Sequence, residues 1–232
     1  PEERKKIFLV TKSGARDPDG MTSLLYRSLE KMKTSHVDLY FVHGISSIDE
    51  LDNKTKTWAE KAKAAKKIRF FGFSTHSNME ECMMGAARLG WIDGIMMTYN
   101  FRLMHSDRMK KAVEACEKAG IGLTAMKTQG GGQVKISSET ELQMAGRFIK
   151  NGYTDKQARL KAVWENPYIA SICSQMPSIN ILMSNASAAM DKTRLSSFDI
   201  DLFRRYAGET TGAYCMGCTR ICESAVAGAA PV

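Results

Sequence analysis

The sequence of 232 residues is 44% hydrophobic and 25% charged, a composition typical of a globular protein and not of a disordered or fibrous one. No apolar run approaches the roughly 20 residues that a membrane-spanning helix needs. The net charge of +8 does not indicate nucleic-acid binding, because the sequence has no recognised nucleic-acid motif and its basic residues do not alternate with aromatic ones.

Six apolar segments alternate with helical stretches along the chain. They are mostly continuous apolar runs, which are typical of parallel strands covered on both faces. The first run ends in the sequence Val-Thr-Lys, so an ammonium group closes a strand that is expected to be buried. We predict strands at Ile7–Val10, Asp38–Val42, Arg69–Phe73, Ile92–Met97, Ile121–Ala125 and Ile169–Cys173.

Helix start and stop signals lie between these strands. The segments Ser77–Glu80 and Thr154–Gln157 have the spacing of capping boxes, which begin helices. Gly90 and Gly120 each follow a helical stretch and precede a strand, as glycines that end helices do. A last helix is predicted over Ser197–Tyr206.

Repeated βα units indicate either an open doubly wound sheet or a (β/α)₈ TIM barrel. No predicted strand is followed by G-x-G-x-x-G, and the glycines at Gly130–Gly132 have the wrong spacing for a dinucleotide fingerprint. We therefore expect an α/β fold of the TIM-barrel type over residues 1–207, with six of the eight βα units present. The two other units are expected upstream of Pro1, and residues 208–232 form a cysteine-rich tail.

Polar side chains follow the first three predicted strands. In a barrel the active site lies at the carboxyl ends of the strands, and there the sequence places Lys12, His43 and the pair Ser74–Thr75. Tyr99–Asn100 and Met126–Lys127 follow the next two strands. A single lysine or histidine at such a position is usually structural, but two on neighbouring strands favour a functional site.

The order of these motifs resembles the aldo-keto reductases. The matching segments are VTK at Val10–Lys12, DLYFVHG at Asp38–Gly44, GFSTHS at Gly72–Ser77 and YN at Tyr99–Asn100, and the likeness extends to about Tyr206. The resemblance implies a (β/α)₈ barrel that moves a hydride between NADP or NAD and a carbonyl or alcohol substrate. Its catalytic set is an aspartate, a tyrosine, a lysine and a histidine.

The resemblance matches Lys12 with the catalytic lysine and His43 with the histidine. An ammonium group near the tyrosine would lower the pKa of that phenol, which is ordinarily near 10. His43 would hold the carbonyl oxygen by a hydrogen bond, where negative charge develops. The aspartate and the tyrosine are expected in the first two βα units, outside the given sequence.

Several cofactor-binding positions depart from the family pattern. Ser74 matches the serine that contacts the carboxamide, but Thr75 and Met96 stand where the family has asparagine and glutamine. Met126 aligns roughly with the ring-stacking aromatic residue, and Asn185 matches the asparagine that meets the adenine. A thioether packs against a ring but offers an amide little hydrogen bonding. No cation stands at the positions that commonly grip the 2′-phosphate, which align with Gln175, Met176 and Ile181.

Three cysteines near the end of the chain have the spacing C-x₂-C-x₃-C; they are Cys215, Cys218 and Cys222. Both zinc and a [4Fe–4S] cluster normally take four ligands, and only three are local. The fourth could be another cysteine, a downstream residue or a non-protein group. The tail resembles the ferredoxin-like extension of one branch of the family, which implies an iron–sulfur cluster, with zinc or unliganded thiols as alternatives.

The other three cysteines stand alone, and we predict that they are inert core residues; they are Cys82, Cys116 and Cys173. Two further hypotheses are a non-catalytic sensor or subunit that binds the nicotinamide cofactor, and an electron-transfer subunit with a redox partner. We expect a small carbonyl or alcohol substrate and neither a nucleic acid nor a membrane as partner. The expected location is the cytoplasm, with export left open by a sequence that begins at Pro1.

Overall fold

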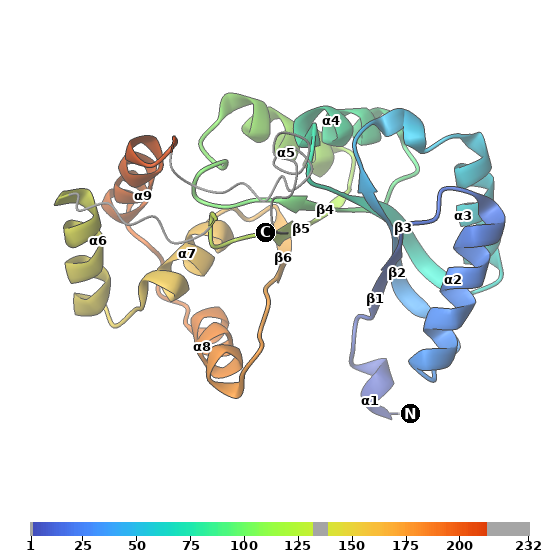
Figure 1. The fold of residues 1–232 in the computed structure, drawn as a ribbon, viewed down its shortest axis with the longest axis horizontal. Helices are drawn as coiled ribbons and strands as arrows, with labels where there is room; N and C mark the ends of the chain where they lie inside the picture. The colour runs from blue at the N-terminus through green and yellow to red at the C-terminus, as the bar shows by residue number, and fades with distance from the viewer. Residues whose placement is uncertain (1, 132–138, 213–232) are drawn as a thin grey trace, which may run out of the picture. The chain divides into compact units, whose positions relative to one another are not determined.

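The computed structural model describes residues 2–131 and 139–212 and consists of two compact units. The first unit comprises residues 1–97 and 108–124, and the second comprises residues 98–107 and 125–232. Strands and helices alternate along most of the chain (Figure 1). In order, they are α1 (Glu2–Lys5), β1 (Val10–Ser13), α2 (Pro18–Lys31), β2 (Val37–Ile45), the 3₁₀ helix η1 (Ile48–Glu50), α3 (Asn53–Ala64), β3 (Ile68–Thr75), α4 (Met79–Leu89), β4 (Gly94–Thr98), α5 (Asp107–Lys118), β5 (Gly122–Met126), α6 (Glu139–Lys150), α7 (Asp155–Trp164), β6 (Ile169–Cys173), α8 (Ile179–Met190) and α9 (Ser197–Glu209).

Six strands of the described residues form one sheet in the order of the chain, β1 to β6. The ladders that join β1 to β2, β2 to β3 and β3 to β4 are all parallel. Parallel neighbours require a crossover connection, and helices supply it between the strands. The predicted α/β class with six βα strands is therefore confirmed, and β6 has the predicted bounds.

The first strand begins three residues later than predicted. Ile7 and Phe8 are more than half exposed, and the ladder with β2 begins at Val10. Leu9 is held instead by Asp38, whose carboxylate accepts a hydrogen bond from the Leu9 N–H at 2.8 Å. Most of the apolar run therefore belongs to the segment that leads into the sheet and not to a buried strand. Lys12 lies within β1 and not after it.

Aromatic side chains cover one face of the first strands. The ring of Tyr40 on β2 lies 5.0 Å from that of Trp58 on α3, and Phe71 on β3 lies 6.1 Å from Trp58 and 5.6 Å from Trp91. The Trp58 indole also donates to the hydroxyl of Thr22 on α2 at 2.9 Å. Burial of these large rings fixes α2 and α3 against this face (Figure 1). We call it the outer face and the opposite one the inner face.

The predicted helix signals are confirmed at three of four positions. Thr154–Gln157 forms a complete capping box, and Gly90 and Gly120 have the positive φ of 70° typical of residues that follow helices. The capping box predicted at Ser77–Glu80 is wrong. Helix α4 begins after Asn78, whose side chain makes no cap and instead donates to the Ser46 carbonyl oxygen at 3.1 Å.

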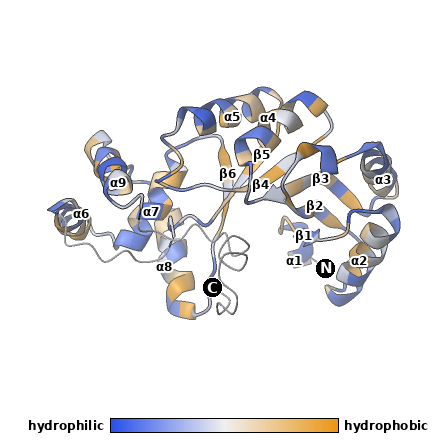
Figure 2. Cartoon of the chain, turned by 45° about the horizontal axis from the view of Figure 1, so that its top comes forward, coloured by the Kyte–Doolittle hydropathy of each residue, from blue (hydrophilic) through white to orange (hydrophobic). Residues whose placement is uncertain are grey.

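The second unit has its own aromatic core. The ring of Phe203 on α9 lies 5.1 Å from Phe101 and 5.2 Å from Phe148 on α6. Helix α8 contributes little to this core, although it consists largely of hydrophobic residues (Figure 2), because Ala188 is the one buried residue of this helix. Within the described ranges, no helix combines the length and the hydrophobicity needed to cross a membrane.

Candidate active site

The register of the ladders shows on which face of the sheet three predicted site residues lie. Lys12 pairs with Phe41, Phe41 pairs with Gly72, and Ser74 pairs with Met96. Since successive side chains of a strand point to opposite faces, Lys12, Ser74 and Met96 share the inner face. The register thus gathers residues from β1, β3 and β4 on the side away from the aromatic cluster.

Lys12 on β1 and Met96 on β4 are in direct contact on the inner face. The ammonium group of Lys12 donates to the sulfur of Met96 at 3.9 Å. Their strands are three spacings apart, which in a flat sheet would separate them by about 14 Å. The two long side chains span part of this distance, and a sheet that curls around its inner face, as the wall of a barrel does, brings their ends into contact.

His43 lies in an irregular part of β2. Val42 pairs with Phe73 and Ile45 pairs with Thr75, so three steps on β2 oppose two on β3. The extra residue makes a β-bulge, and Gly44 has the positive φ of 72° that glycine adopts readily. His43 therefore lies within the strand and not at its end as predicted, on a segment whose direction the bulge changes.

Two side chains satisfy the backbone groups that the bulge takes out of the ladder. The Gly44 N–H donates to the hydroxyl of Ser74 at 3.0 Å, and Arg16 donates to the His43 carbonyl oxygen at 2.9 Å. Ser74 is fully buried, and its hydroxyl proton can still be given to a further acceptor. The predicted site residue Ser74 thus also positions the segment that carries His43.

The imidazole of His43 lies in a positive environment. Partial burial, the charge of Lys12 and the charge of Arg16 all lower the pKa of His43 below its ordinary value of 6.5. The ring is therefore neutral at pH 7, with one nitrogen donating and the other accepting. The ring of His76 lies edge-on to it, with centroids 6.4 Å apart.

Glycines let the strands approach closely beneath this site. A Cβ atom on Gly72 would lie 1.8 Å from the carbonyl oxygen of Gly94 and 3.1 Å from the ring of Phe41. Phe41 is fully buried on the inner face. No other residue type fits at Gly72, so the aromatic ring packs directly against bare backbone.

Thr75 differs from the other predicted site residues of the first unit. It pairs with Met97, one step beyond Ser74, and so follows the outer face. Its hydroxyl donates to the Ser77 carbonyl oxygen at 2.7 Å and also lies by the thiol of Cys82 on α4. The structure therefore does not bring the Thr75 side chain together with Lys12 on the inner face.

The tyrosine nearest Lys12 in the ladder does not join the site either. Tyr40 pairs with Thr11 and belongs to the outer face, where its hydroxyl lies 2.5 Å from that of Ser13. Burial raises the pKa of Tyr40, which is the wrong direction for a phenol that must exchange its proton near neutral pH. Tyr40 is therefore not a substitute for the family tyrosine.

Two predicted cofactor-binding residues belong to the second unit. Met126 ends β5, is buried, and accepts the Tyr99 N–H on its carbonyl oxygen at 3.1 Å. Asn185 on α8 donates to the hydroxyl of Ser174 at 3.2 Å. The Tyr99 hydroxyl accepts a hydrogen bond from Asn166 at 2.8 Å, so its polar group has a structural role.

The single cysteines have two environments. Cys82 and Cys116 are buried, and burial raises their pKa values to about 11 and about 12. Cys173, predicted as a core residue, is exposed at the end of β6, because the strand leaves most of its residues exposed. The tail cysteines lie outside the described residues, and within those residues no three metal-ligating side chains gather.

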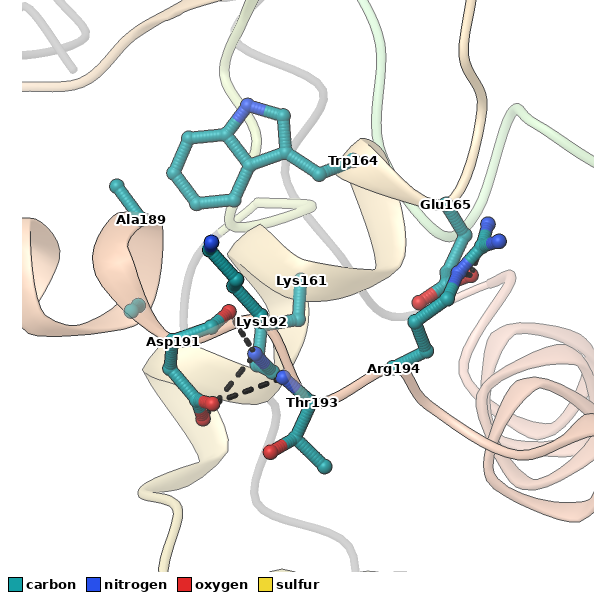
Figure 3. A pocket seen from close by; sticks show the side chains of 9 residues that line it. Lys161, Trp164, Glu165, Ala189, Asp191, Lys192, Thr193 and Arg194 are labelled. Atoms are coloured by element: carbon teal, nitrogen blue, oxygen red, sulfur yellow. Dashed lines mark hydrogen bonds and ion pairs between the residues drawn. The ribbon is translucent and has the colours of Figure 1, made fainter.

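A cavity of about 220 Å³ lies beside the end of α8, and none of the predicted site residues lines it (Figure 3). Four of its charged side chains form two ion pairs. Lys161 lies 3.2 Å from the carboxylate of Asp191, and Arg194 lies 2.9 Å from that of Glu165. These pairs leave the cavity a structural feature of the second unit and not a candidate active site.

Sequence reasoning missed Arg16, Glu50 and the bulge. The segment Ser47–Glu50 has the S-x-x-E spacing of a capping box, and the structure forms that box. Gly44, next to a histidine inside an apolar run, is the usual sign of a bulge. Nothing in the local sequence connects Arg16 with either feature.

Comparison with known proteins identifies the fold. The sequence profile of the aldo/keto reductase family matches residues 1–166. Comparison with curated proteins gave no match. Among solved structures, the holo form of the aldo-keto reductase AKR11C1 from Bacillus halodurans has a TM-score of 0.71 and 19% identity, over 87% of this chain and 73% of that one.

Two structures from Klebsiella pneumoniae are similar to the same extent. An aldo/keto reductase in complex with NADP and acetate has a TM-score of 0.71 and 21% identity, over 88% of this chain and 71% of that one. A second, in complex with NADPH, has a TM-score of 0.70 and 21% identity, over 89% and 72% of the two chains. At these identities the likeness shows a common fold, which agrees with the predicted class.

Proposed function

Because the chain belongs to the aldo/keto reductase family, we propose that it is part of a nicotinamide-dependent oxidoreductase. The reaction is hydride transfer between NADP or NAD and a small carbonyl or alcohol substrate. The observation that carries this proposal is the contact of Lys12 with Met96 across the inner face. It brings the ammonium group to the wall where Ser74 also lies, at the carboxyl ends of the strands.

The groups on the inner face and on the bulge of β2 fit a nicotinamide and a carbonyl oxygen. Lys12 supplies an ammonium, His43 a neutral imidazole, and Ser74 a buried hydroxyl with a proton still to donate. When bound, the cofactor supplies or accepts the hydride. The donor from this chain is the N–H of His43, which would stabilise negative charge on the carbonyl oxygen.

In this proposal Lys12 assists the transfer of the tyrosine proton and takes no part in the transfer of the hydride. A fixed ammonium group favours the phenolate form of a nearby tyrosine and so lowers the pKa of that phenol. No tyrosine of the given sequence matches the family tyrosine by motif. Lys12 and His43 are therefore the catalytic residues proposed for this chain.

For cofactor binding we propose Ser74 and Met96 in the first unit, and Met126 and Asn185 in the second. Thr75 remains a proposal with weaker support, since its hydroxyl is engaged with Ser77. The Klebsiella structures contain NADP and NADPH, and we propose NADP or NAD for this protein. Binding constants for NADP and NAD would show which cofactor the protein prefers.

A panel of aldehydes and ketones tests the activity, with loss of nicotinamide absorbance as the measurement. We expect turnover by the protein that contains this chain, and a loss of roughly a hundredfold or more in kcat for Lys12→Met and for His43→Gln. Arg108→Gln is the matched control, because it removes a cation that pairs with Glu81 on the surface. Full turnover by both site variants would refute these roles.

The alternative proposal is a cofactor-binding sensor or subunit without turnover. It is favoured by Met96, a thioether where the family has an amide, whose sulfur lies 3.9 Å from the ammonium group of Lys12. Tight cofactor binding with no hydride transfer to any substrate would support it.

We also propose an iron–sulfur cluster on the tail cysteines Cys215, Cys218 and Cys222, with zinc as the alternative. Of the single cysteines, only Cys173 is exposed among the described residues and so available as a fourth ligand. A visible absorption spectrum that bleaches with dithionite would support the cluster and an electron-transfer role. A colourless protein with bound zinc would favour the alternative.

A further inference from the structure

The bulge that carries His43 is held by an arginine from a different strand connection. Arg16 follows β1, and its guanidinium donates to the His43 carbonyl oxygen at 2.9 Å and to the Gly14 carbonyl oxygen at 3.1 Å. The third nitrogen, Nε, donates to the carboxylate of Glu50 at 2.9 Å. One planar group therefore joins the loop after β1, the bulge of β2 and η1.

Glu50 is itself firmly held. Its second oxygen accepts hydrogen bonds from the Ser46 N–H at 2.7 Å and from the Ser47 N–H at 3.1 Å. Burial opposes ionisation, but the hydrogen bonds from Ser46, Arg16 and Ser47 outweigh it and lower the pKa of Glu50 to about 2. The carboxylate is therefore charged across the working pH range and keeps Arg16 in one orientation.

We propose that Arg16, oriented by Glu50, is a positioning residue for His43 that sets the direction of the bulge and hence of the imidazole. The peptide group of His43 lies outside the regular ladder, so side-chain partners must fix it. Ser74 holds the N–H that follows, and Arg16 holds the carbonyl. This role rests on the proposed function, in which His43 donates to the substrate.

Arg16 also acts through its charge. The charged groups that face His43 are Lys12 on β1 and Arg16 after β1, with Glu50 reaching it only through Arg16, and His76 lies edge-on after β3. Both cations disfavour the imidazolium form. The positioning effect and the charge effect of Arg16 can be separated by Arg16→Lys, because lysine keeps the charge but cannot donate to three acceptors in one plane.

The first test is an NMR titration of the imidazole signals. The chain has four histidines, and His43→Gln assigns the His43 signal by its disappearance. In Arg16→Gln we expect the pKa of His43 to rise, and in Arg16→Lys and the charge-matched control Arg108→Gln to stay at the wild-type value. This readout does not depend on turnover. An unchanged His43 titration in Arg16→Gln would overturn the electrostatic part of the proposal.

The second test is kinetic and uses the intact protein. We expect kcat to fall roughly ten- to hundredfold in both Arg16→Lys and Arg16→Gln, with the KM for cofactor unchanged, because a misplaced imidazole affects the reacting atoms. Glu50→Gln should give the same loss, since its amide would turn a donor toward Arg16 Nε.

A double variant distinguishes the positioning role of Arg16 from the proposed catalytic function of His43. In the His43→Gln background, Arg16→Lys should cause no further loss of kcat, because the group that it positions is absent. An equal loss in both backgrounds would refute the positioning role. If His43→Gln alone had wild-type turnover, the proposed function of His43 would fail, whereas the NMR result for Arg16 would still stand.

Discussion

The ammonium nitrogen of Lys12 lies 3.9 Å from the sulfur of Met96, although two strands of the sheet separate their backbones. This contact fits a curved sheet with small or flat groups between the two residues. Gly72 and the ring of Phe41 provide that space. Curvature thus gathers on one wall the side chains that the sequence distributes over more than eighty positions.

The thioether of Met96 should weaken cofactor binding. We expect Met96→Gln to tighten NADPH or NADH binding several-fold, because one added hydrogen bond to the carboxamide contributes about 1 kcal/mol. Fluorescence titration measures the change. Met96→Leu is the matched control and should bind as the wild type does, since leucine fills similar volume without an amide. Equal affinities for the glutamine and leucine variants would place Met96 outside the cofactor site.

The lowered pKa of His43 predicts a pH-dependent stability. In the unfolded chain the imidazole has a pKa near 6.5, so between that value and the lower folded pKa the unfolded state binds more protons. Stability conferred by the neutral ring is therefore complete above about pH 6.5 and is lost as the pH falls through the folded pKa. Thermal unfolding between about pH 5 and 8 should show a smaller acid-induced loss for His43→Gln than for the wild type. The same dependence of unfolding temperature on pH in both proteins would contradict the lowered pKa of His43.

Gly72 should tolerate no side chain. A Cβ atom there meets the Gly94 carbonyl oxygen at 1.8 Å, so Gly72→Ala must displace a strand. We expect a loss of about 3 kcal/mol or a failure to fold. Gly146→Ala on α6 meets nothing within 4 Å and should stabilise the protein by about 0.5 to 1 kcal/mol. Denaturant unfolding of both variants would make the comparison, and a harmless Gly72→Ala would refute the close packing.

Asp199 should stabilise the second unit through the start of α9. Its buried carboxylate accepts hydrogen bonds from Arg147 and from the N–H and hydroxyl of Ser196. Although burial opposes ionisation, these partners lower the pKa of Asp199. We expect Asp199→Ala to cost about 2 kcal/mol of unfolding free energy. The control Asp201→Ala breaks an exposed pair with Arg204 and should cost less than about 0.5 kcal/mol; equal losses would contradict the account.

The apolar runs of the sequence predict the strands because a buried parallel strand needs continuous hydrophobic residues on both faces. They do not predict exposure, so Ile7 and Phe8 were assigned to a strand although they lie outside it. The motif spacing predicts Lys12 and His43 as site residues, since each follows the apolar run of its own strand. The network of Arg16 and Glu50 depends on loops that meet only after folding, and a local pattern cannot predict it.

Perturbation of the His43 imidazole signal by cofactor tests the central claim most directly. If Lys12, His43 and Ser74 surround the nicotinamide, saturating NADPH should shift the His43 resonance. Adenosine 2′,5′-bisphosphate, which lacks the nicotinamide half, should leave that resonance in place when it is bound. Binding of NADPH with no change at His43, or an equal shift with both ligands, would contradict the account.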